Sequence, residues 1–416
     1  MKSETQVNPL SNAQKSMNHI KMLQVLFALF LLVFAGCRHV EPIQTEMPLQ
    51  GKSSATVQQP EADSTLPQTE APMKVGYFLG NGSRGGGIFL LGKILAHSPQ
   101  VELTLLDGAD LRAGKLAGKE LLVVPGGSSA LQYQDMEEEG AEAVRQFVAS
   151  GGSYFGVCAG FHCALNRDER IKLLPYTWYF GGNGLRATLM VELNEKAAER
   201  IQVPAGRYKV RYSRGPISKR CEQPGTGWAE ELGYYRDEMP ETPITFGGAP
   251  AMLYGEYGKG KVIATSFHPE FFPETHPIAI GSIYAVTGRK LTPITPPKDA
   301  DAIRVAYFSN GLPAKLWVEN ALALDADAHI SFQLATAINK ELLEKVDVVI
   351  CPNKASNAYK AILGNEQNAA LLRQFVENGG RLLVTKTGLL FAPKHENVRV
   401  IQDEIEGEKL CDLICK

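Results

Sequence analysis

The stretch VRQFVASGGSYFGVCAG at residues 144–160 decides the fold, because the chain returns to it as LRQFVENGGRLLVTKTG at residues 372–388. Each version combines a helical segment, a Gly-Gly turn and a short apolar strand. Two shorter segments recur in the same order: KVGYF at 74–78 as RVAYF at 304–308, and LLVVPGG at 121–127 as VVICPNK at 348–354. Apolar strands that alternate with helices predict a parallel sheet covered on both faces. We therefore expect two doubly wound α/β domains, of which the second is a degenerate repeat.

The chain of 416 residues is long enough for these two domains and for further segments. Its formal net charge of −2 leaves no basic excess to neutralise phosphates, so we predict no nucleic-acid partner. The predicted boundaries are a signal peptide at 1–36, a disordered tether at 37–72, a first domain at 73–290, a linker at 291–302 and a second domain at 303–416.

The N-terminal segment predicts export and a lipid anchor. The apolar run LQVLFALFLLVFA at residues 23–35 follows basic residues and is short for a membrane span, which fits the core of a signal peptide. It ends in Phe34-Ala35-Gly36-Cys37, which resembles a bacterial lipobox and implies that Cys37 carries acyl chains such as palmitate. An uncleaved membrane anchor is the alternative. Either interpretation places the domains outside the cytoplasm, in the periplasm or facing the cell envelope, with the bacterial membrane as a partner.

The glycines around Cys158 raise a choice between packing and catalysis. A buried thiol can simply fill space. However, the pattern Gly156-Val157-Cys158-Ala159-Gly160 ends a strand and begins a helix, which is the arrangement of a nucleophile on a sharp turn. The start of a helix favours the thiolate, the form that attacks. The second domain has Lys386 at this position, so we expect it to lack a nucleophile.

Two other segments supply groups that a thiol nucleophile needs. His268 follows an apolar run, and Glu270 two residues later is placed to orient the imidazole, as the third member of a triad does. The Pro125-Gly126-Gly127 turn ends another strand, where a glycine lets a backbone N–H approach an oxyanion. We therefore predict Cys158, His268 and Glu270 as catalytic residues, with the N–H groups of Gly127 and Ala159 as the oxyanion hole.

These motifs together resemble class I glutamine amidotransferase domains, which have a flavodoxin-like sheet. The pattern P-G-G, then G-V-C-A-G, then S-F-H-P-E occurs in that family's order over residues 73–290. The details look most similar to the N-terminal domain of biotin–protein ligases, which also occurs in bacterial lipoproteins. The resemblance implies a Cys–His–Glu triad at Cys158, His268 and Glu270. The GRGRxG-type loop of biotin ligases is absent from the sequence, so biotin ligation is not implied. Phe161-His162 stand where glutaminases commonly have His-Gln.

Further residues are predicted around the thiol, although other interpretations compete for them. We expect Gly82, Arg84, Gly126, Phe161 and His162 to bind substrate, with Arg84 available to a carboxylate. The segment YSRGP at 212–216 is a candidate second pocket loop. The alternative for Gly80–Gly85 is a G-x-G-x-x-G dinucleotide site with Asp107 as its ribose-binding acid. His162 and Cys163 suggest a metal pair, but no further ligands have matching spacing, and we predict neither a metal nor a cofactor.

Two functions from different classes remain open. The first is a thiol hydrolase of glutaminase or amidohydrolase type, which cleaves or transfers an amide or acyl group of a small molecule or peptide through Cys158. Hydrolysis is favoured over transfer because the sequence has no P-loop for activating an acceptor. The second is a non-catalytic ligand-binding or scaffold lipoprotein that keeps the fold, as the second domain does without a thiol.

Overall fold

The computed structural model describes residues 71–180, 185–221, 227–237, 246–309, 311–353, 356–403 and 405–416. The predicted signal peptide, the predicted lipidation site Cys37 and nearly all of the predicted tether lie outside these residues. None of the helices in the described part of the chain has the length and apolar character that crossing a bilayer requires.

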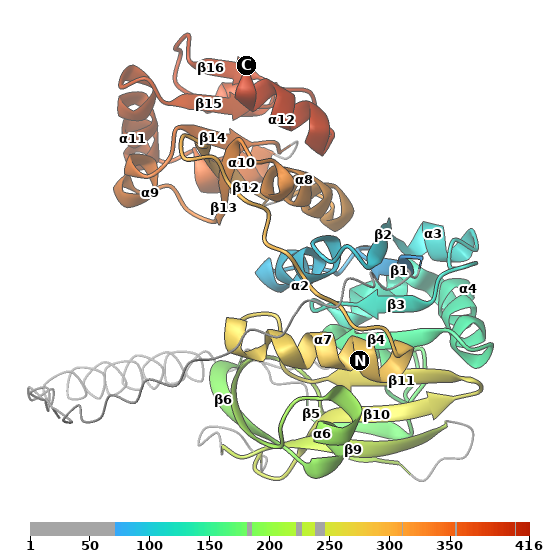
Figure 1. Cartoon of the computed structure of the whole chain (residues 1–416). Helices are drawn as coiled ribbons and strands as arrows, with labels where there is room; N and C mark the ends of the chain where they lie inside the picture. Colours follow the sequence, from blue (N-terminus) through green and yellow to red (C-terminus); the bar gives the residue numbers. More distant parts are fainter. Residues whose placement is uncertain are drawn as a thin grey trace, which may run out of the picture. The chain divides into compact units, whose positions relative to one another are not determined.

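The first sheet has the strand order β2-β1-β3-β4-β11-β10-β9-β6-β7 (Figure 1). From β2 to β11 neighbouring strands are parallel, and from β11 to β7 they are antiparallel. The strands are β1 (Met73–Phe78), β2 (Val101–Leu106), β3 (Leu121–Val124), β4 (Ser153–Val157), β6 (Arg186–Leu193), β7 (Gly206–Ser213), β9 (Trp228–Tyr235), β10 (Pro250–Tyr257) and β11 (Gly260–Thr265). A separate antiparallel pair consists of β5 (Tyr176–Phe180) and β8 (Ile217–Arg220).

Helices cover both faces of this sheet because its central strands are apolar on both sides. In β3, Leu121 and Val123 belong to one buried cluster, while Leu122 and Val124 belong to the other. Successive strand residues point to opposite faces, so the unbroken apolar run fills two cores. One core includes residues of α2 (Gly86–Ala96), α6 (Glu195–Ile201) and α7 (His276–Thr287). The other includes residues of α3 (Gly108–Arg112), α4 (Ser129–Ala149) and α5 (Ala159–Ala164).

The second sheet repeats the parallel part of the first. Its order, β13-β12-β14-β15-β16, follows the same path as β2-β1-β3-β4-β11, and its neighbouring strands are all parallel. The strands are β12 (Ile303–Phe308), β13 (Ile330–Ala335), β14 (Val348–Cys351), β15 (Arg381–Val384) and β16 (Val398–Val400). The helices are α8 (Ala314–Ala326), α9 (Lys340–Glu344), α10 (Ser356–Ile362), α11 (Glu366–Glu377) and α12 (Gly407–Cys415), with short 3₁₀ turns η1 (Pro273–Thr275) and η2 (Gly388–Leu390) in the two halves.

The predicted fold class, α/β with two parallel-sheet units, is confirmed by this topology. One feature differs from the expectation: the first sheet is parallel only as far as β11 and continues through antiparallel strands. Those strands come from residues between β4 and β11, a region in which the second domain has only a short connection. The extension matters for function because β7 ends beside the predicted nucleophile.

A candidate thiol site at the carboxyl ends of the strands

Cys158 occupies a sharp turn between β4 and α5. Its φ of 55° and ψ of −99° form a conformation that L residues rarely adopt and that costs about 1–3 kcal/mol. A Cβ added at Gly156 would lie 2.6 Å from the Gly160 carbonyl oxygen, and one at Gly160 would lie 1.9 Å from that of Val124. The glycines on both sides therefore allow β4, α5 and β3 to approach closely. Strain at this one residue indicates that the turn is built to present the thiol.

Hydrogen bonds hold the thiol in a buried position. The backbone N–H of Cys158 donates to the carbonyl oxygen of Thr265, the last residue of β11, at 2.8 Å. The sulfhydryl donates to the carbonyl oxygen of Ser213, at the end of β7, at 3.3 Å. Cys158 is only 4% exposed. Three strands thus fix the predicted nucleophile, and one of them is the antiparallel β7.

The structure brings His268 and Glu270 to the same place. Strands β4 and β11 are parallel neighbours, so the segments that follow them emerge at one edge of the sheet. The His268 N–H donates to the Arg211 carbonyl oxygen at 2.9 Å, which ties this segment to β7. His268 Nδ1 lies 2.7 Å from Glu270 Oε1. Cys158 and His268 line the same cavity, and a Cβ added at Gly126 would lie 2.7 Å from His268 Cε1 and 3.7 Å from Cys158 Cβ. The three predicted triad residues are therefore brought together at one edge of the sheet.

The charges around His268 favour its protonated form. Burial by itself would lower the pKa of His268, but the negative charges of Glu270 and Cys158 and their hydrogen bonds raise it to about 10. Protonated imidazole beside a sulfur favours the thiolate by opposite charge. A protonated imidazole close to a thiol is the arrangement on which many cysteine nucleophiles depend.

The Pro-Gly-Gly turn lies against both the triad and the glycine loop at residues 80–85. A Cβ on Gly126 would lie 2.7 Å from His268 Cε1. Gly127 has φ of 147°, and a Cβ there would lie 2.0 Å from the Gly82 carbonyl oxygen, which accepts the Ser128 N–H at 2.8 Å. Only glycine fits such approaches. Among the described residues, the N–H groups of Gly127 and Ala159 have no acceptor. Gly127 lines the cavity at Cys158, whereas Ala159 is buried and is not among the lining residues.

A cavity of about 500 Å³ opens onto the thiol. Of the residues predicted for this site, Cys158, His268, Gly127 and Arg84 line it. The YSRGP segment, predicted as a candidate pocket loop, supplies Ser213 and Arg214. The lining also contains residues that sequence reasoning did not assign: Gly86, Gly87, Arg186, Arg211 and Phe271.

Gly87 lines the cavity but was not predicted, although the glycine run in the sequence could have indicated it. It lies in the run Arg84-Gly85-Gly86-Gly87, just inside α2. A Cβ at position 87 would lie 2.4 Å from Glu270 Oε1 and 3.4 Å from His268 Nδ1. A side chain here would displace the His–Glu pair. Three consecutive glycines at the start of a helix are unfavourable for helix formation, which could have indicated a close approach.

Two predicted substrate-binding residues are not brought to the cavity. Phe161 is fully buried among the apolar side chains on the face of the sheet opposite to the cluster that contains Cys158. The His162 ring packs edge-on against Trp178 at 5.5 Å between centroids. Burial first, and then the charge of Arg170, lower the pKa of His162 to about 3. The short helix α5 turns both side chains into the interior, so neither belongs to the pocket wall. Gly82 and Gly126 do not line the cavity either, but they contact residues that do: Gly82 packs on Gly127, and Gly126 packs on His268.

The dinucleotide alternative has a structural explanation for each of its features. Asp107 caps α3: its Oδ1 accepts the Asp110 N–H at 3.0 Å, and the Asp107 N–H donates to Asp110 Oδ2 at 3.1 Å. Asp107, the residue that a dinucleotide site would use to bind the ribose, is therefore engaged in a reciprocal capping box. The glycine loop packs on the Pro-Gly-Gly turn instead of opening toward a diphosphate.

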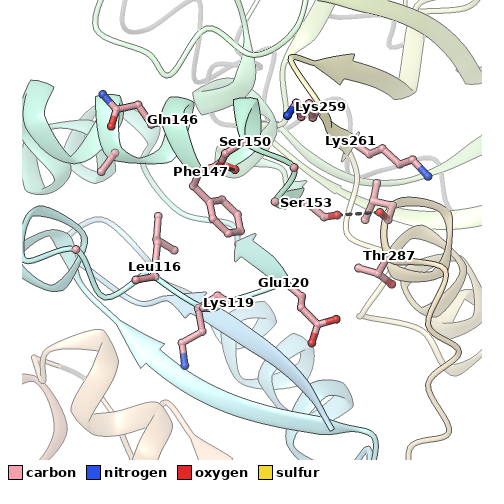
Figure 2. A pocket seen from close by; sticks show the side chains of 17 residues that line it. Leu116, Lys119, Glu120, Gln146, Phe147, Ser150, Ser153, Lys259, Lys261 and Thr287 are labelled. Atoms are coloured by element: carbon pink, nitrogen blue, oxygen red, sulfur yellow. Dashed lines mark hydrogen bonds between the residues drawn. The ribbon is translucent and has the colours of Figure 1, made fainter. Parts of the chain in front are cut away.

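A larger hollow lies at the other end of the first sheet (Figure 2). It has about 910 Å³ and includes Leu116, Phe147 and Ser153, near the amino ends of β3 and β4. Ser153 Oγ donates to the Val286 carbonyl oxygen at 2.8 Å, as the dashed line in Figure 2 shows. Ligands of open parallel sheets bind at the carboxyl ends of the strands. The smaller cavity at Cys158 is at that end, so it is the candidate site.

The second domain lacks the elbow as well as the thiol. By the pairing of β14 with β15, Lys386 follows its strand as Cys158 follows β4. Lys386 is exposed, and it is not among the described residues with positive φ. The strained conformation of Cys158 is therefore not repeated at Lys386. Lys354, which the repeat aligns with Gly127, lies outside the described residues.

Comparison with known proteins identifies relatives of the first domain. Residues 116–169 match the protein family described as biotin-protein ligase, N terminal. A biotin–protein ligase of Schizosaccharomyces pombe is 25% identical over 267 residues, which cover 56% of this chain and 41% of that enzyme. The chain thus spans about two fifths of the length of this relative.

Solved structures show more distant similarity. PurLQS from Thermotoga maritima has a TM-score of 0.39 and 14% identity, with 51% of this chain and 96% of that chain covered. A structure titled glutamine amidotransferase has a TM-score of 0.35 and 23% identity, with 50% and 97% covered. The sequence matches confirm the predicted resemblance: the first domain is similar to the N-terminal domain of biotin–protein ligases.

Proposed function

We propose that this protein is a lipid-anchored, extracytoplasmic thiol hydrolase that cleaves an amide bond through Cys158. The observation that carries the proposal is the strained Cys158 turn beside a buried His268–Glu270 pair. A strained, buried thiol beside an ion pair has little structural benefit, whereas nucleophilic catalysis needs all three features. Similarity to the biotin–protein ligase N-terminal domain adds support for the fold that carries the site.

The residues have distinct roles in the proposed reaction. His268 takes the thiol proton, and the Cys158 sulfur attacks the carbonyl carbon, whose oxygen becomes negative between the Gly127 and Ala159 N–H groups. Protonated His268 then gives its proton to the nitrogen as the C–N bond breaks, which leaves a thioester and a free amine. Water attacks the thioester with His268 as the base, and the products are a carboxylic acid and the regenerated thiol. Glu270 orients His268 and stabilises its charge throughout.

The location is part of the same proposal. Cys37 follows a signal-peptide-like apolar run and would carry the lipid, while residues 41–72 would connect the anchor to the first domain. Metabolic labelling with a radioactive fatty acid tests this part: the wild-type chain should be labelled and Cys37→Ala should not. Labelling of both chains, or of neither, would remove the lipid anchor from the proposal without affecting the thiol site.

The catalytic part is tested by the alkylation rate of Cys158 in the full chain. Iodoacetamide labelling is followed by peptide mass spectrometry, which separates Cys158 from the other thiols. At about pH 6 we expect Cys158 to react at least roughly tenfold faster in the wild type than in His268→Ala, because the imidazolium maintains the thiolate. Glu270→Gln should give an intermediate rate. Equal, slow labelling in all three chains would contradict catalysis and favour a ligand-binding role.

A further inference from the structure

The cavity that opens onto the thiol is lined by several arginines. In the described part of the chain, the cavity at Cys158 is lined by Arg84, Arg186, Arg211 and Arg214. No aspartate or glutamate is among the described lining residues. Glu270, the nearest acid of the site, is already paired with His268. The cavity therefore carries an excess of positive charge beyond what the triad itself requires.

Another arginine on β7 forms an ion pair with a carboxylate, whereas the cavity arginines form none with the described residues. On β7, Arg207 lies opposite Glu192 on β6 and forms an ion pair with it at 3.0 Å. Four residues further along the same strand, Arg211 lies opposite Thr188.

None of the cavity arginines forms an ion pair with another residue that the structure describes. Arg84, Arg186 and Arg214 are exposed and Arg211 is half-buried. Four like charges around one cavity repel one another, and an anion bound among them would offset that repulsion.

The backbone positions of these arginines are fixed relative to the nucleophile. Arg186 begins β6 and is the pairing partner of Ser213, whose carbonyl oxygen accepts the Cys158 sulfhydryl. The Arg211 carbonyl oxygen accepts the His268 N–H, and the Arg214 N–H donates to the Leu185 carbonyl oxygen at 3.1 Å. One end of the β6–β7 pair thus places the backbone of three arginines beside the triad, and all three residues line the cavity.

This arrangement occurs in the domain that has the thiol. Strands β6 and β7 belong to the long segment between β4 and β11, while in the second domain β15 is followed by β16 after a short connection. The fourth arginine, Arg84, comes from the glycine loop, where the second domain has Leu312-Pro313 in place of Ser83-Arg84. The first domain therefore has both the cavity arginines and the thiol, and the second domain has neither at the corresponding positions.

From this convergence we infer that the substrate is an anionic amide, with a carboxylate or phosphate group that the arginines bind while Cys158 attacks the carbonyl. The inference rests on the proposed function and names its substrate class. Guanidinium groups bind both anions through paired N–H donors, and in a partly enclosed cavity they orient the substrate as well as attract it.

Two alkylating agents of nearly equal size test the inference, because iodoacetate is an anion and iodoacetamide is neutral. The measured quantity is the ratio of their rates at Cys158 in the full chain, with the exposed Cys415 as the internal reference. We expect the iodoacetate-to-iodoacetamide ratio to be roughly tenfold higher at Cys158 than at Cys415. Raising the salt concentration should reduce the difference.

Matched variants assign the effect to the arginines. Arg211→Gln and Arg186→Gln should each lower the ratio at Cys158 by roughly twofold to fivefold, the range for one exposed charge pair. Arg207→Gln on the same strand removes an arginine that is already paired with Glu192, and it should leave the ratio unchanged. Arg84→Gln provides an independent variant outside the β-strands, in case a strand substitution disturbs folding.

The outcomes separate this inference from the proposed function. One outcome is fast, His268-dependent labelling by iodoacetamide, with an iodoacetate-to-iodoacetamide ratio at Cys158 that equals the ratio at Cys415 and does not change in the arginine variants. That outcome would overturn the anionic substrate and leave the proposed thiol enzyme intact. Slow labelling by both reagents, independent of His268, would overturn both. Competition then identifies the anion: succinate should slow iodoacetamide labelling if a carboxylate is bound, and inorganic phosphate should do so if a phosphate is bound. Slowing by neither anion at millimolar concentration would count against the inference.

Discussion

His268 Nδ1 lies 2.7 Å from Glu270 Oε1, and both side chains are almost completely buried. Glu270 Oε2 is buried without a hydrogen-bond partner among the described residues. A buried carboxylate is costly unless a positive group compensates it. The pair therefore exists because His268 can carry a proton, which links the stability of the first domain to the chemistry proposed for it.

The first prediction concerns pH. Burial lowers the pKa of His268, but the charge of Glu270 is the largest of the effects that outweigh it, and the pKa is raised from 6.5 to about 10. A raised pKa in the folded state contributes stability that is fully present below about pH 6.5 and is lost as pH rises toward about 10. We expect the urea midpoint of the wild type to fall more steeply over this range than that of His268→Gln. Parallel curves for the two chains would show that His268 is not held protonated.

The second prediction concerns the strained turn. Cys158 has φ of 55°, which glycine adopts without strain and alanine does not. After subtraction of the greater chain entropy of glycine in the unfolded state, Cys158→Gly should be more stable than Cys158→Ala by about 1 kcal/mol. Both variants remove the thiol, so the comparison isolates the backbone. Urea unfolding measures the difference, and an alanine variant that is equally or more stable would contradict strain at this residue.

The third prediction separates His162 from the site. Burial and the charge of Arg170 hold the pKa of His162 at about 3, so the folded protein resists a proton that the unfolded chain binds below about pH 6.5. This lowered pKa makes the wild type lose stability as pH falls from about 6.5 toward 3. His162→Leu should remove that loss, so between pH 7.5 and pH 5 it should gain about 2 kcal/mol of unfolding free energy relative to the wild type.

The same variant is a control for the active site. His162 is four residues from Cys158, yet its ring packs on Trp178 and does not line the cavity. The alkylation rate of Cys158 in His162→Leu should therefore stay within about twofold of the wild type, in contrast to His268→Ala. A large decrease in the alkylation rate would show that His162 contributes to the pocket.

Much of the site could be predicted because its signals are local. A nucleophile on a strand-to-helix turn needs small residues on both sides, and Gly156 and Gly160 provide them within five positions. His268 and Glu270 lie two residues apart, so their contact depends on one short segment. The Asp107 capping box shows the limit of such reasoning, because the same residue and spacing also suited a ribose-binding acid.

The sequence by itself determined the repeated α/β framework, since the order of apolar strands and Gly-Gly turns is written twice in the chain. It also determined which residues could form the triad. The tertiary structure decided which way Phe161 and His162 face, because the rotation of a short helix depends on what it packs against. It also decided that Arg186, Arg211 and Arg214 meet at Cys158, since antiparallel pairing joins residues that no sequence spacing connects. The geometry of the candidate triad follows from local turns, whereas the arginine lining of the cavity follows from long-range strand pairing.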